Sequence, residues 1–245
     1  MTAFPVDESL TRDLSGNASA ASRLRSLHQR IAGCHRCVEA GALERAAPVL
    51  AVPTVSRLVL VGQAPGRVEE GSGRPFSGRA GRILFRWLER AGLGQEEEAR
   101  RRVYLTSITK CFPGPAPSGG GDRRPSRVEA ELCRPFLTRQ LQILDPWLVL
   151  LVGQMALAHF LGPIPMERAV GRVLDPGGEP WSVEAAGRSS LRPLFLPLPH
   201  PSGASRWLND PEHKLRLEEA LTALGRLVRA SLQPPDGGSE RARMT

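Results

Sequence analysis

Lysine is almost absent from this 245-residue sequence, in which 31 of the 33 basic residues are arginine and only Lys110 and Lys214 are lysine. The 25 acidic residues leave a formal net charge of +8. A surface rich in guanidinium groups offers planar, bidentate donors for phosphate, so the composition predicts an anionic partner such as nucleic acid. A GC-rich coding bias is the alternative explanation of the arginine excess.

Long hydrophobic runs are also missing from the sequence. No segment approaches the roughly 20 apolar residues that span a bilayer, and the N-terminal residues lack the basic and then apolar order of a signal peptide. We therefore expect a cytoplasmic protein with no membrane partner. The polar ends, residues 1–21 and 233–245, are predicted to be disordered, which leaves one domain over residues 22–232.

Cysteine is scarce, and four thiols in a cytoplasmic protein are more plausible as metal ligands than as disulfides. Cys34 and Cys37 form a close pair, whereas Cys111 and Cys133 are single and far away in the sequence. This arrangement fits a tetrahedral zinc site and a four-iron, four-sulfur cluster equally well. The alternative is that Cys111 and Cys133 are only small buried side chains.

Short apolar runs alternate with helical patterns along the chain. The runs at 57–62, 103–109, 147–153 and 192–199 are predicted to be strands, with helices over 81–92 and 127–144. The second helix would bury Val128, Leu132, Phe136 and Leu137. This order predicts an α/β fold with three layers, α/β/α, around a central, mostly parallel four-stranded sheet. Ligands would bind in the loops that follow Val61, Ile108, Val152 and Leu198.

The glycine-rich segment 62–81 follows the first predicted strand. It contains no GK[ST], and no GxGxxG follows the strand, so a nucleotide triphosphate or dinucleotide is disfavoured as the ligand. Instead it carries Glu69, Glu70 and Phe76 between glycines that allow the backbone to approach a ligand closely. His200 directly follows the last predicted strand and is expected at the same sheet edge, whereas the other four histidines are interpreted as structural.

Two motifs carry a family resemblance. GQAPGRVEEGSGRPFSGRAGRIL, at 62–84, resembles the first motif of the iron–sulfur uracil-DNA glycosylases of bacteria and archaea, the family-4 type, which typically reads GEAPG, acids and GRPFVGRAG. HPSGASR, at 200–206, is similar to their second motif. The cysteine order matches as well, with a Lys-Cys at a strand end and a CRPF on a helix. The resemblance covers roughly residues 22–230.

The resemblance implies hydrolysis of the N-glycosidic bond of uracil, or another deaminated base, flipped out of DNA at the start of base-excision repair. Glu69 would position the attacking water, and His200 would hydrogen-bond uracil O2 as negative charge develops there. Phe76 would stack on the base. The remaining base-binding residues would be Gly62, Gln63, Ala64 and Ser107.

The resemblance also implies a cofactor and a DNA surface. The four cysteines would hold a 4Fe-4S cluster, with zinc as the less favoured alternative. The loop after His200 would enter the DNA stack, with Arg206 or Trp207 filling the gap left by the base. The expected DNA contacts are Arg74, Ser202, Arg206 and Trp207, and the protein is expected to act as a monomer.

The sequence departs from the family-4 pattern at two places. TSITKC puts Ser107 where the family's TNVVKC has an asparagine, and a hydroxyl cannot reproduce the paired donor and acceptor of an amide. In addition, PSGASR is similar to the NPSGLSR loop of the mismatch-specific branch of the superfamily. Both departures indicate a divergent member with a broader or shifted base range. A DNA-binding protein of the same superfamily that is weakly active or inactive is the alternative.

Overall fold

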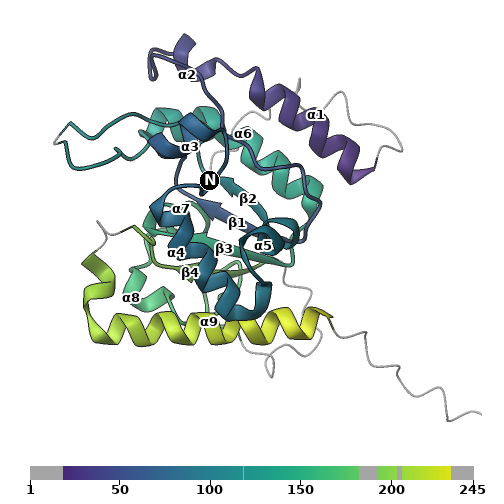
Figure 1. The fold of residues 1–245 in the computed structure, drawn as a ribbon, viewed down its shortest axis with the longest axis vertical. Coiled ribbons are helices and arrows are strands. Elements are labelled where there is room, and N and C mark those ends of the chain that lie inside the picture. The colour runs from purple at the N-terminus through teal and green to yellow at the C-terminus, as the bar shows by residue number, and fades with distance from the viewer. Residues whose placement is uncertain (1–18, 118, 182–192, 203–205, 233–245) are drawn as a thin grey trace, which may run out of the picture.

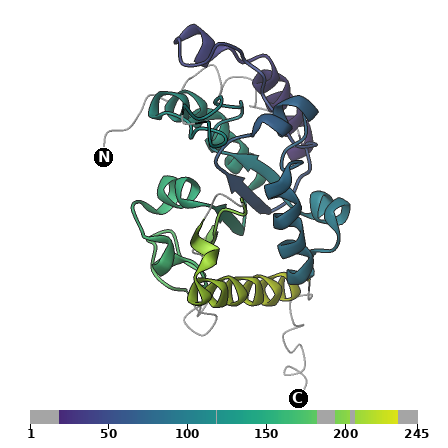
Figure 2. The same cartoon turned by 60° about the vertical axis from the view of Figure 1, so that its left-hand side comes forward.

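A four-stranded sheet lies at the centre of the computed structural model, which describes residues 19–117, 119–181, 193–202 and 206–232 (Figures 1 and 2). Its strands are β1 (Leu58–Gly62), β2 (Tyr104–Ser107), β3 (Leu148–Val152) and β4 (Leu194–Leu198). They are all parallel and run in the spatial order β2-β1-β3-β4. The predicted strands and the α/β class are confirmed, and the sheet is wholly rather than mostly parallel.

Every residue of the four strands is buried. This explains why the strands have continuous apolar runs instead of an alternating pattern, since a parallel sheet is covered on both faces. In the register of the sheet, Leu60 is paired with Leu105 and Leu150, and Gly62 at the end of β1 is paired with Ser107 at the end of β2. The carboxyl ends of the strands therefore meet at one edge.

Helices cover both faces of this sheet and form the two outer layers (Figure 1). On one side α1 packs against α6, and on the other side α9 contacts β4 and the π-helical turn η3 that extends α4. Of the remaining short helices, α2 precedes β1, η4 follows β4, and the others lie in the connections between strands. The bounds are α1 Ala20–Ala32, α2 Arg36–Glu39, α3 Arg67–Ser72, α4 Arg79–Leu88, η3 Glu89–Leu93, α5 Glu96–Arg102, α6 Arg127–Leu144, α7 Gln154–Leu161, α8 Met166–Ala169, η4 Arg206–Asn209 and α9 Pro211–Leu232.

Helix α6 has the predicted bounds, and Phe136 and Leu137 are buried as predicted, but the start of its predicted face is wrong. Val128 is 50% exposed, whereas Glu129 beside it is buried. Ser126 and Glu129 form a capping box at the start of the helix, and Arg123 makes two hydrogen bonds to the Glu129 carboxylate, at 2.8 and 2.6 Å. A carboxylate satisfied in this way can be buried, and it turns the neighbouring valine toward solvent.

The strand order places a topological switch point at the carboxyl ends of β1 and β3, where ligands of such sheets bind.

Helix α1 begins at Ala20, and the predicted disordered ends fall largely at 1–18 and 233–245, outside the described ranges. Within the part of the chain that the structure describes, no helix combines the length and apolar character needed to cross a membrane.

Candidate functional site

A cleft opens at the carboxyl edge of the sheet, where the sequence predicted a ligand site. All four strands or the loops that follow them contribute to its walls, and the hairpin at 114–123 closes one side. The predicted site residues in the cleft are Gly62, Gln63, Ala64, Glu69, Phe76, Ser107, His200 and Ser202. These residues are spread over more than 130 positions of the sequence, yet they face one hollow.

Phe76 stands on a strained backbone at the wall of this cleft. Its φ of 54° lies in the left-handed region that an L-residue rarely occupies. A Cβ on Gly62 would lie 2.9 Å from the Phe76 ring, and a Cβ on Gly81 would lie 1.8 Å from the Phe76 carbonyl oxygen. Both glycines are therefore required for the ring to reach its place above the end of β1.

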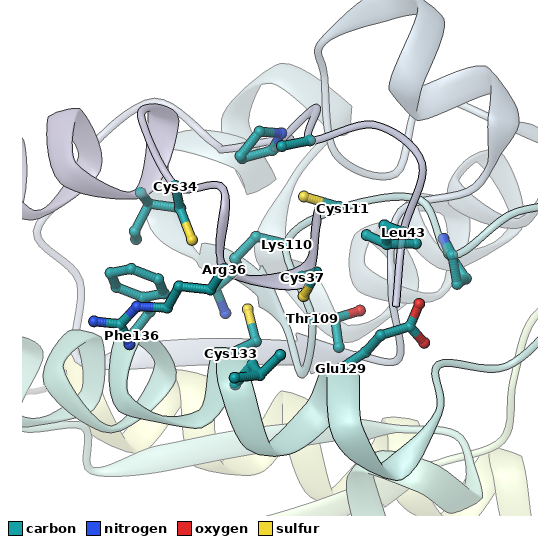
Figure 3. Close-up of a pocket in the computed structure, with 15 residues that line it drawn as sticks. Cys34, Arg36, Cys37, Leu43, Thr109, Lys110, Cys111, Glu129, Cys133 and Phe136 are labelled. Carbon is teal, nitrogen blue, oxygen red and sulfur yellow. The ribbon is translucent and has the colours of Figure 1, made fainter. Parts of the chain in front are cut away.

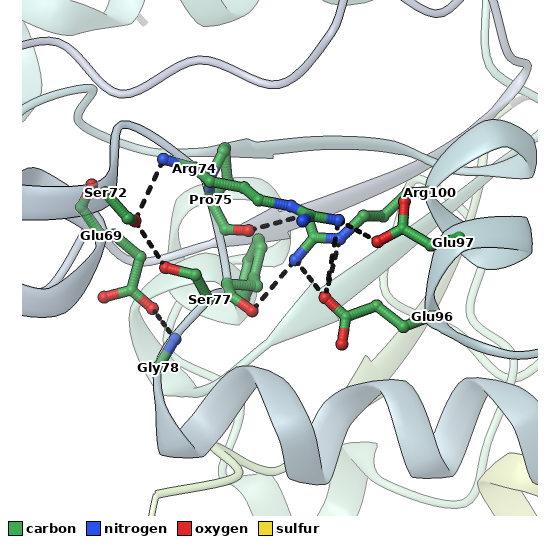
Figure 4. Close-up of polar contacts among 10 residues, drawn as sticks. Glu69, Ser72, Arg74, Pro75, Ser77, Gly78, Glu96, Glu97 and Arg100 are labelled. Carbon is green, nitrogen blue, oxygen red and sulfur yellow. Dashed lines mark hydrogen bonds and ion pairs between the residues drawn. The ribbon is translucent and has the colours of Figure 1, made fainter.

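Arg100 fixes the backbone on which Phe76 stands (Figure 4). Its guanidinium donates to the carbonyl oxygens of Pro75 at 2.9 Å and of Phe76 at 3.2 Å, and it pairs with Glu96 at 2.8 Å. The side chain is only 11% exposed and lies over the Phe85 ring. These contacts hold the strained turn in one conformation.

Glu69 links two separate parts of the glycine-rich segment, and Figure 4 shows its contact with Gly78. One carboxylate oxygen accepts from the backbone N–H of Gly66 at 3.1 Å, and the other accepts from the N–H of Gly78 at 2.9 Å. Each carboxylate oxygen keeps a further lone pair that can accept from a water molecule. Glu69 thus shapes the pocket wall whatever else it does.

His200 presents one defined ring nitrogen to the cleft. Its Nδ1 accepts from the backbone N–H of Ser202 at 3.3 Å and lies 2.9 Å from the Ser202 hydroxyl. Burial, followed by the nearby charge of Arg124, lowers the pKa of His200 below its ordinary value, so the ring is neutral at pH 7. A neutral imidazole that accepts at Nδ1 carries its proton on Nε2, and it can donate that proton to a ligand.

Ser107 is buried at the floor of the cleft, and its hydroxyl and carbonyl oxygen both form hydrogen bonds within the protein. Its hydroxyl donates to the Thr109 carbonyl oxygen at 2.7 Å, which leaves the Ser107 oxygen free only as an acceptor. Its own carbonyl oxygen accepts from the side-chain ammonium of Lys110. Lys110 is wholly buried and reaches from the cleft floor toward the cysteines.

The predicted DNA contacts are only partly available. Arg74 is paired with Glu97, and Trp207 donates from its indole nitrogen to Glu167 at 3.1 Å. Ser202 lies against His200. The side chain of Arg206 lies outside what the structure describes.

The four cysteines line a second pocket (Figure 3). Cys34 follows α1, Cys37 lies in α2, Cys111 follows β2 and Cys133 lies in α6. All four are free thiols, and the rest of the lining is mostly apolar. The structure therefore brings together thiols that are 99 positions apart in the sequence at the extremes.

Electrostatics in this pocket favour a metal centre whose complex with the four thiolates carries a net negative charge. Burial and the neighbouring thiols raise the pKa of Cys37 to about 11, and burial also raises the pKa of Cys133. Burial lowers the pKa of Lys110 to about 8, against the attraction of Cys133 and Cys111. No carboxylate pairs with the Lys110 ammonium among the described residues. A buried ammonium of this kind needs an anion, and four metal-bound thiolates with a net negative charge would provide one.

The four thiols form a ligand set that suits two kinds of metal centre, zinc and a four-iron, four-sulfur cluster. Among the described residues, no three His, Cys, Asp or Glu side chains are arranged to hold a metal ion as they stand. A single zinc at about 2.3 Å from each sulfur would draw all four thiolates around one atom. A four-iron, four-sulfur cluster would likewise take four cysteine thiolates as its ligands, and the four sulfur atoms stand around one pocket in Figure 3.

The chain belongs to the uracil DNA glycosylase superfamily, whose family model matches residues 51–222. It is similar to proteins named type-4 uracil-DNA glycosylase. The one from Thermotoga maritima is 35% identical over 166 residues, which covers 67% of this chain and 74% of the relative. The one from Archaeoglobus fulgidus is 30% identical over 173 residues, with 70% and 77% covered. The one from Pyrobaculum aerophilum is 34% identical over 130 residues, which covers 60% of that relative and 53% of this chain.

Two residues that hold the cleft in place are not evident from the sequence as site residues. Arg100 lies in a run of charged residues that looks like an ordinary solvated helix, and nothing in its spacing points to Phe76. Lys110 had a usable signal, because a lysine between an apolar strand and a cysteine, in a chain with only one other lysine, is unusual. That signal was read as part of a motif and not as a buried charge.

Proposed function

We propose that this protein is a DNA glycosylase that hydrolyses the N-glycosidic bond of uracil, or of another deaminated base, and so begins base-excision repair. The observation that carries the proposal is His200, a neutral imidazole with its Nε2 proton free, in a cleft that Phe76 and Ser107 share. A fixed neutral donor suits a leaving base that becomes an anion. The superfamily membership and the names of the relatives support the same activity.

Base binding would use groups that the fold holds in place. The Phe76 ring offers a stacking face, and stacking contributes about 1–3 kcal/mol per base. The Ser107 oxygen can only accept, so it favours a base that presents an N–H at that edge, as uracil, hypoxanthine and xanthine do. The backbone of Gly62 to Ala64 forms the adjoining wall.

The chemical step would break one bond and form one. The bond between C1′ of the deoxyribose and the base nitrogen breaks, and its electron pair stays with the base, where His200 stabilises the charge on the carbonyl oxygen. The oxygen of a water molecule held near Glu69 bonds to C1′, and its proton is released to the carboxylate or to solvent. The base anion then takes up one proton from solvent, so the products are the free base and an abasic site. The substrate is DNA, and no partner protein is needed for this step, so we propose a monomer.

The cofactor in this proposal is a 4Fe-4S cluster held by Cys34, Cys37, Cys111 and Cys133. When bound, it would supply folding free energy by tying α1, α2, the segment after β2 and α6 together. Lys110 would neutralise part of the cluster's charge. Its hydrogen bond to the Ser107 carbonyl oxygen would connect the cluster site to the floor of the base cleft. The similarity to proteins named type-4 uracil-DNA glycosylase supports this cluster over zinc.

A DNA-binding protein with little or no catalytic activity is the second candidate. One specific observation favours it. Ser107, at the family's asparagine position, donates its hydroxyl hydrogen bond to the Thr109 carbonyl oxygen and has no donor left for a base. Both oxygens of Glu69 are likewise engaged by backbone N–H groups. If these groups serve structure alone, the cleft would bind an extruded nucleotide without cleaving it.

The deciding experiment measures release of free base from single- and double-stranded oligonucleotides that carry uracil, hypoxanthine or xanthine. The unchanged protein is compared with His200→Ala and Ser107→Asn. Release of uracil that is lost in His200→Ala supports the glycosylase. Absence of release by the folded, iron-loaded protein, with activity gained in Ser107→Asn, supports the binding protein.

A further inference from the structure

A second hollow adjoins the base cleft, and we propose that it binds the nucleotide next to the flipped one, with its base stacked on Trp207 and its phosphate on Arg124. This inference rests on the proposed function, because it takes the ligand of the first cleft to be an extruded nucleotide. The hollow shares Gln63, Asp122, His200 and Ser202 with the base cleft. A DNA strand that leaves the base cleft past His200 therefore enters the second hollow directly.

The walls of this hollow suit a nucleobase. Trp207 contributes an indole ring to the lining, Met155 and Met166 contribute polarizable apolar surface, and Gln154 contributes a polar amide. Base stacking on an aromatic side chain tolerates any sequence, since every base has a π-face. A glycosylase that must act in many sequence contexts gains from a contact of this kind.

Trp207 is held as a rigid platform. Its indole stacks on the His213 ring with centroids 4.1 Å apart and planes 6° from parallel. Its indole nitrogen donates to Glu167 at 3.1 Å, and His213 Nδ1 lies 2.8 Å from the Trp207 carbonyl oxygen. The stack on His213 occupies one face of the indole, and the platform costs little entropy when a base settles on its remaining surface.

Arg124 supplies the charge that a nucleotide needs. It is exposed, and no ion pair holds its guanidinium among the described residues, in contrast to Arg123, which is bound to Glu129. It lines this hollow together with His200, and His200 also lines the base cleft. A guanidinium in this position can bind the phosphate that links the flipped nucleotide to its neighbour.

A cycle of substitutions in both protein and DNA tests the inference by equilibrium binding. The probe is an oligonucleotide with a tetrahydrofuran abasic analogue at the target position, and with the 5′ or 3′ neighbour either intact or also replaced by tetrahydrofuran. We expect removal of one of the two neighbouring bases to weaken binding to the unchanged protein about tenfold. Trp207→Leu should bind the intact probe about tenfold more weakly than the unchanged protein does. On the probe that lacks that neighbouring base, Trp207→Leu should bind as well as the unchanged protein.

Matched variants complete the design. Trp207→Phe keeps an aromatic face and should recover most of the binding, whereas Trp181→Leu removes an indole that does not line the hollow and should bind like the unchanged protein. Arg124→Gln should reduce the dependence of log Kd on log salt by about one unit.

Three results would overturn the inference: independent losses from Trp207→Leu and from the missing base, equal binding by Trp207→Leu and the unchanged protein, or no recovery in Trp207→Phe. Base release from a uracil oligonucleotide is measured separately on the unchanged protein. Release together with a failed cycle rejects the neighbour site and leaves the glycosylase standing. A coupled cycle without release supports the neighbour site and rejects the catalytic proposal.

Discussion

Arg100 and Phe76 lie 24 residues apart in the sequence, yet the Arg100 guanidinium donates to the Phe76 carbonyl oxygen at 3.2 Å. The same group holds the Pro75 carbonyl oxygen at 2.9 Å. The residue that would stack on the base is thus positioned by a helix on the far side of the glycine-rich segment. A left-handed backbone at a phenylalanine is costly, and it persists because these contacts fix it.

Arg100→Leu is therefore expected to disturb the pocket. It leaves two carbonyl oxygens without their donor and should lower the free energy of unfolding by roughly 1–3 kcal/mol. Activity should fall more through KM than through kcat, because the stacking face moves while His200 stays. Urea denaturation and steady-state base release measure the two effects. Arg101→Leu, at an exposed position of the same helix, is the matched control and should change neither.

The protonation of His200 gives a second prediction. Its lowered pKa and its acceptor role at Nδ1 mean that base release should stay constant from pH 8 to about pH 6.5 and fall only at lower pH. A 15N NMR spectrum of the imidazole should show the proton on Nε2 at pH 7. His200→Ala should reduce base release by roughly 10²–10³-fold, the usual effect of removing one such donor. An inflection of activity at or above pH 6.5 that belongs to His200 would contradict this account.

Lys110→Met should have opposite effects on the two forms of the protein. With a dianionic cluster bound, loss of the buried ammonium removes its counter-charge, so iron content per chain and the melting temperature should both fall. In the metal-free protein the same change removes an unpaired buried charge and should raise stability or leave it unchanged. Lys214→Met, at the exposed second lysine, serves as the control. Equal destabilisation of both forms would show that Lys110 acts by packing alone.

Acid should destabilise the protein through the buried His28 and the half-buried His159. Burial, and then Lys110, lowers the pKa of His28 to about 4, and burial, then Arg134 and Lys110, lowers that of His159 to about 4. Between pH 6.5 and 4 the unfolded chain binds more protons than the folded one, so stability is fully present above pH 6.5 and falls as pH drops toward 4.

His28→Asn tests this window by urea denaturation at pH 7 and pH 5. The His28 Nε2 lies 2.7 Å from the hydroxyl oxygen of Tyr104, the one tyrosine of the chain, and that oxygen accepts from Gln140 at 2.6 Å. The variant should be less stable at pH 7 and should lose less stability on acidification than the unchanged protein. His35→Asn, at an exposed position, should keep the original pH dependence. An unchanged slope in His28→Asn would remove His28 from the explanation.

The sequence by itself determined the sheet and the edge at which to look. Continuous apolar runs predict buried parallel strands, and the carboxyl ends of such strands gather the loops at 62–66 and after Leu198. It also determined the superfamily, because the glycine-rich motif and the histidine motif are local in the chain. These features depend on periodicity and on short segments, which a single sequence displays directly.

Only the tertiary structure decided how the site residues are held. Val128 was expected in the core and is exposed, because the capping box at Ser126 and Glu129 sets the rotation of α6. The link from Arg100 to Phe76 and the burial of Lys110 between the thiols and Ser107 join segments distant in sequence. Such contacts depend on the packing of whole elements, and residue type and spacing carry no record of which distant partner a side chain will meet.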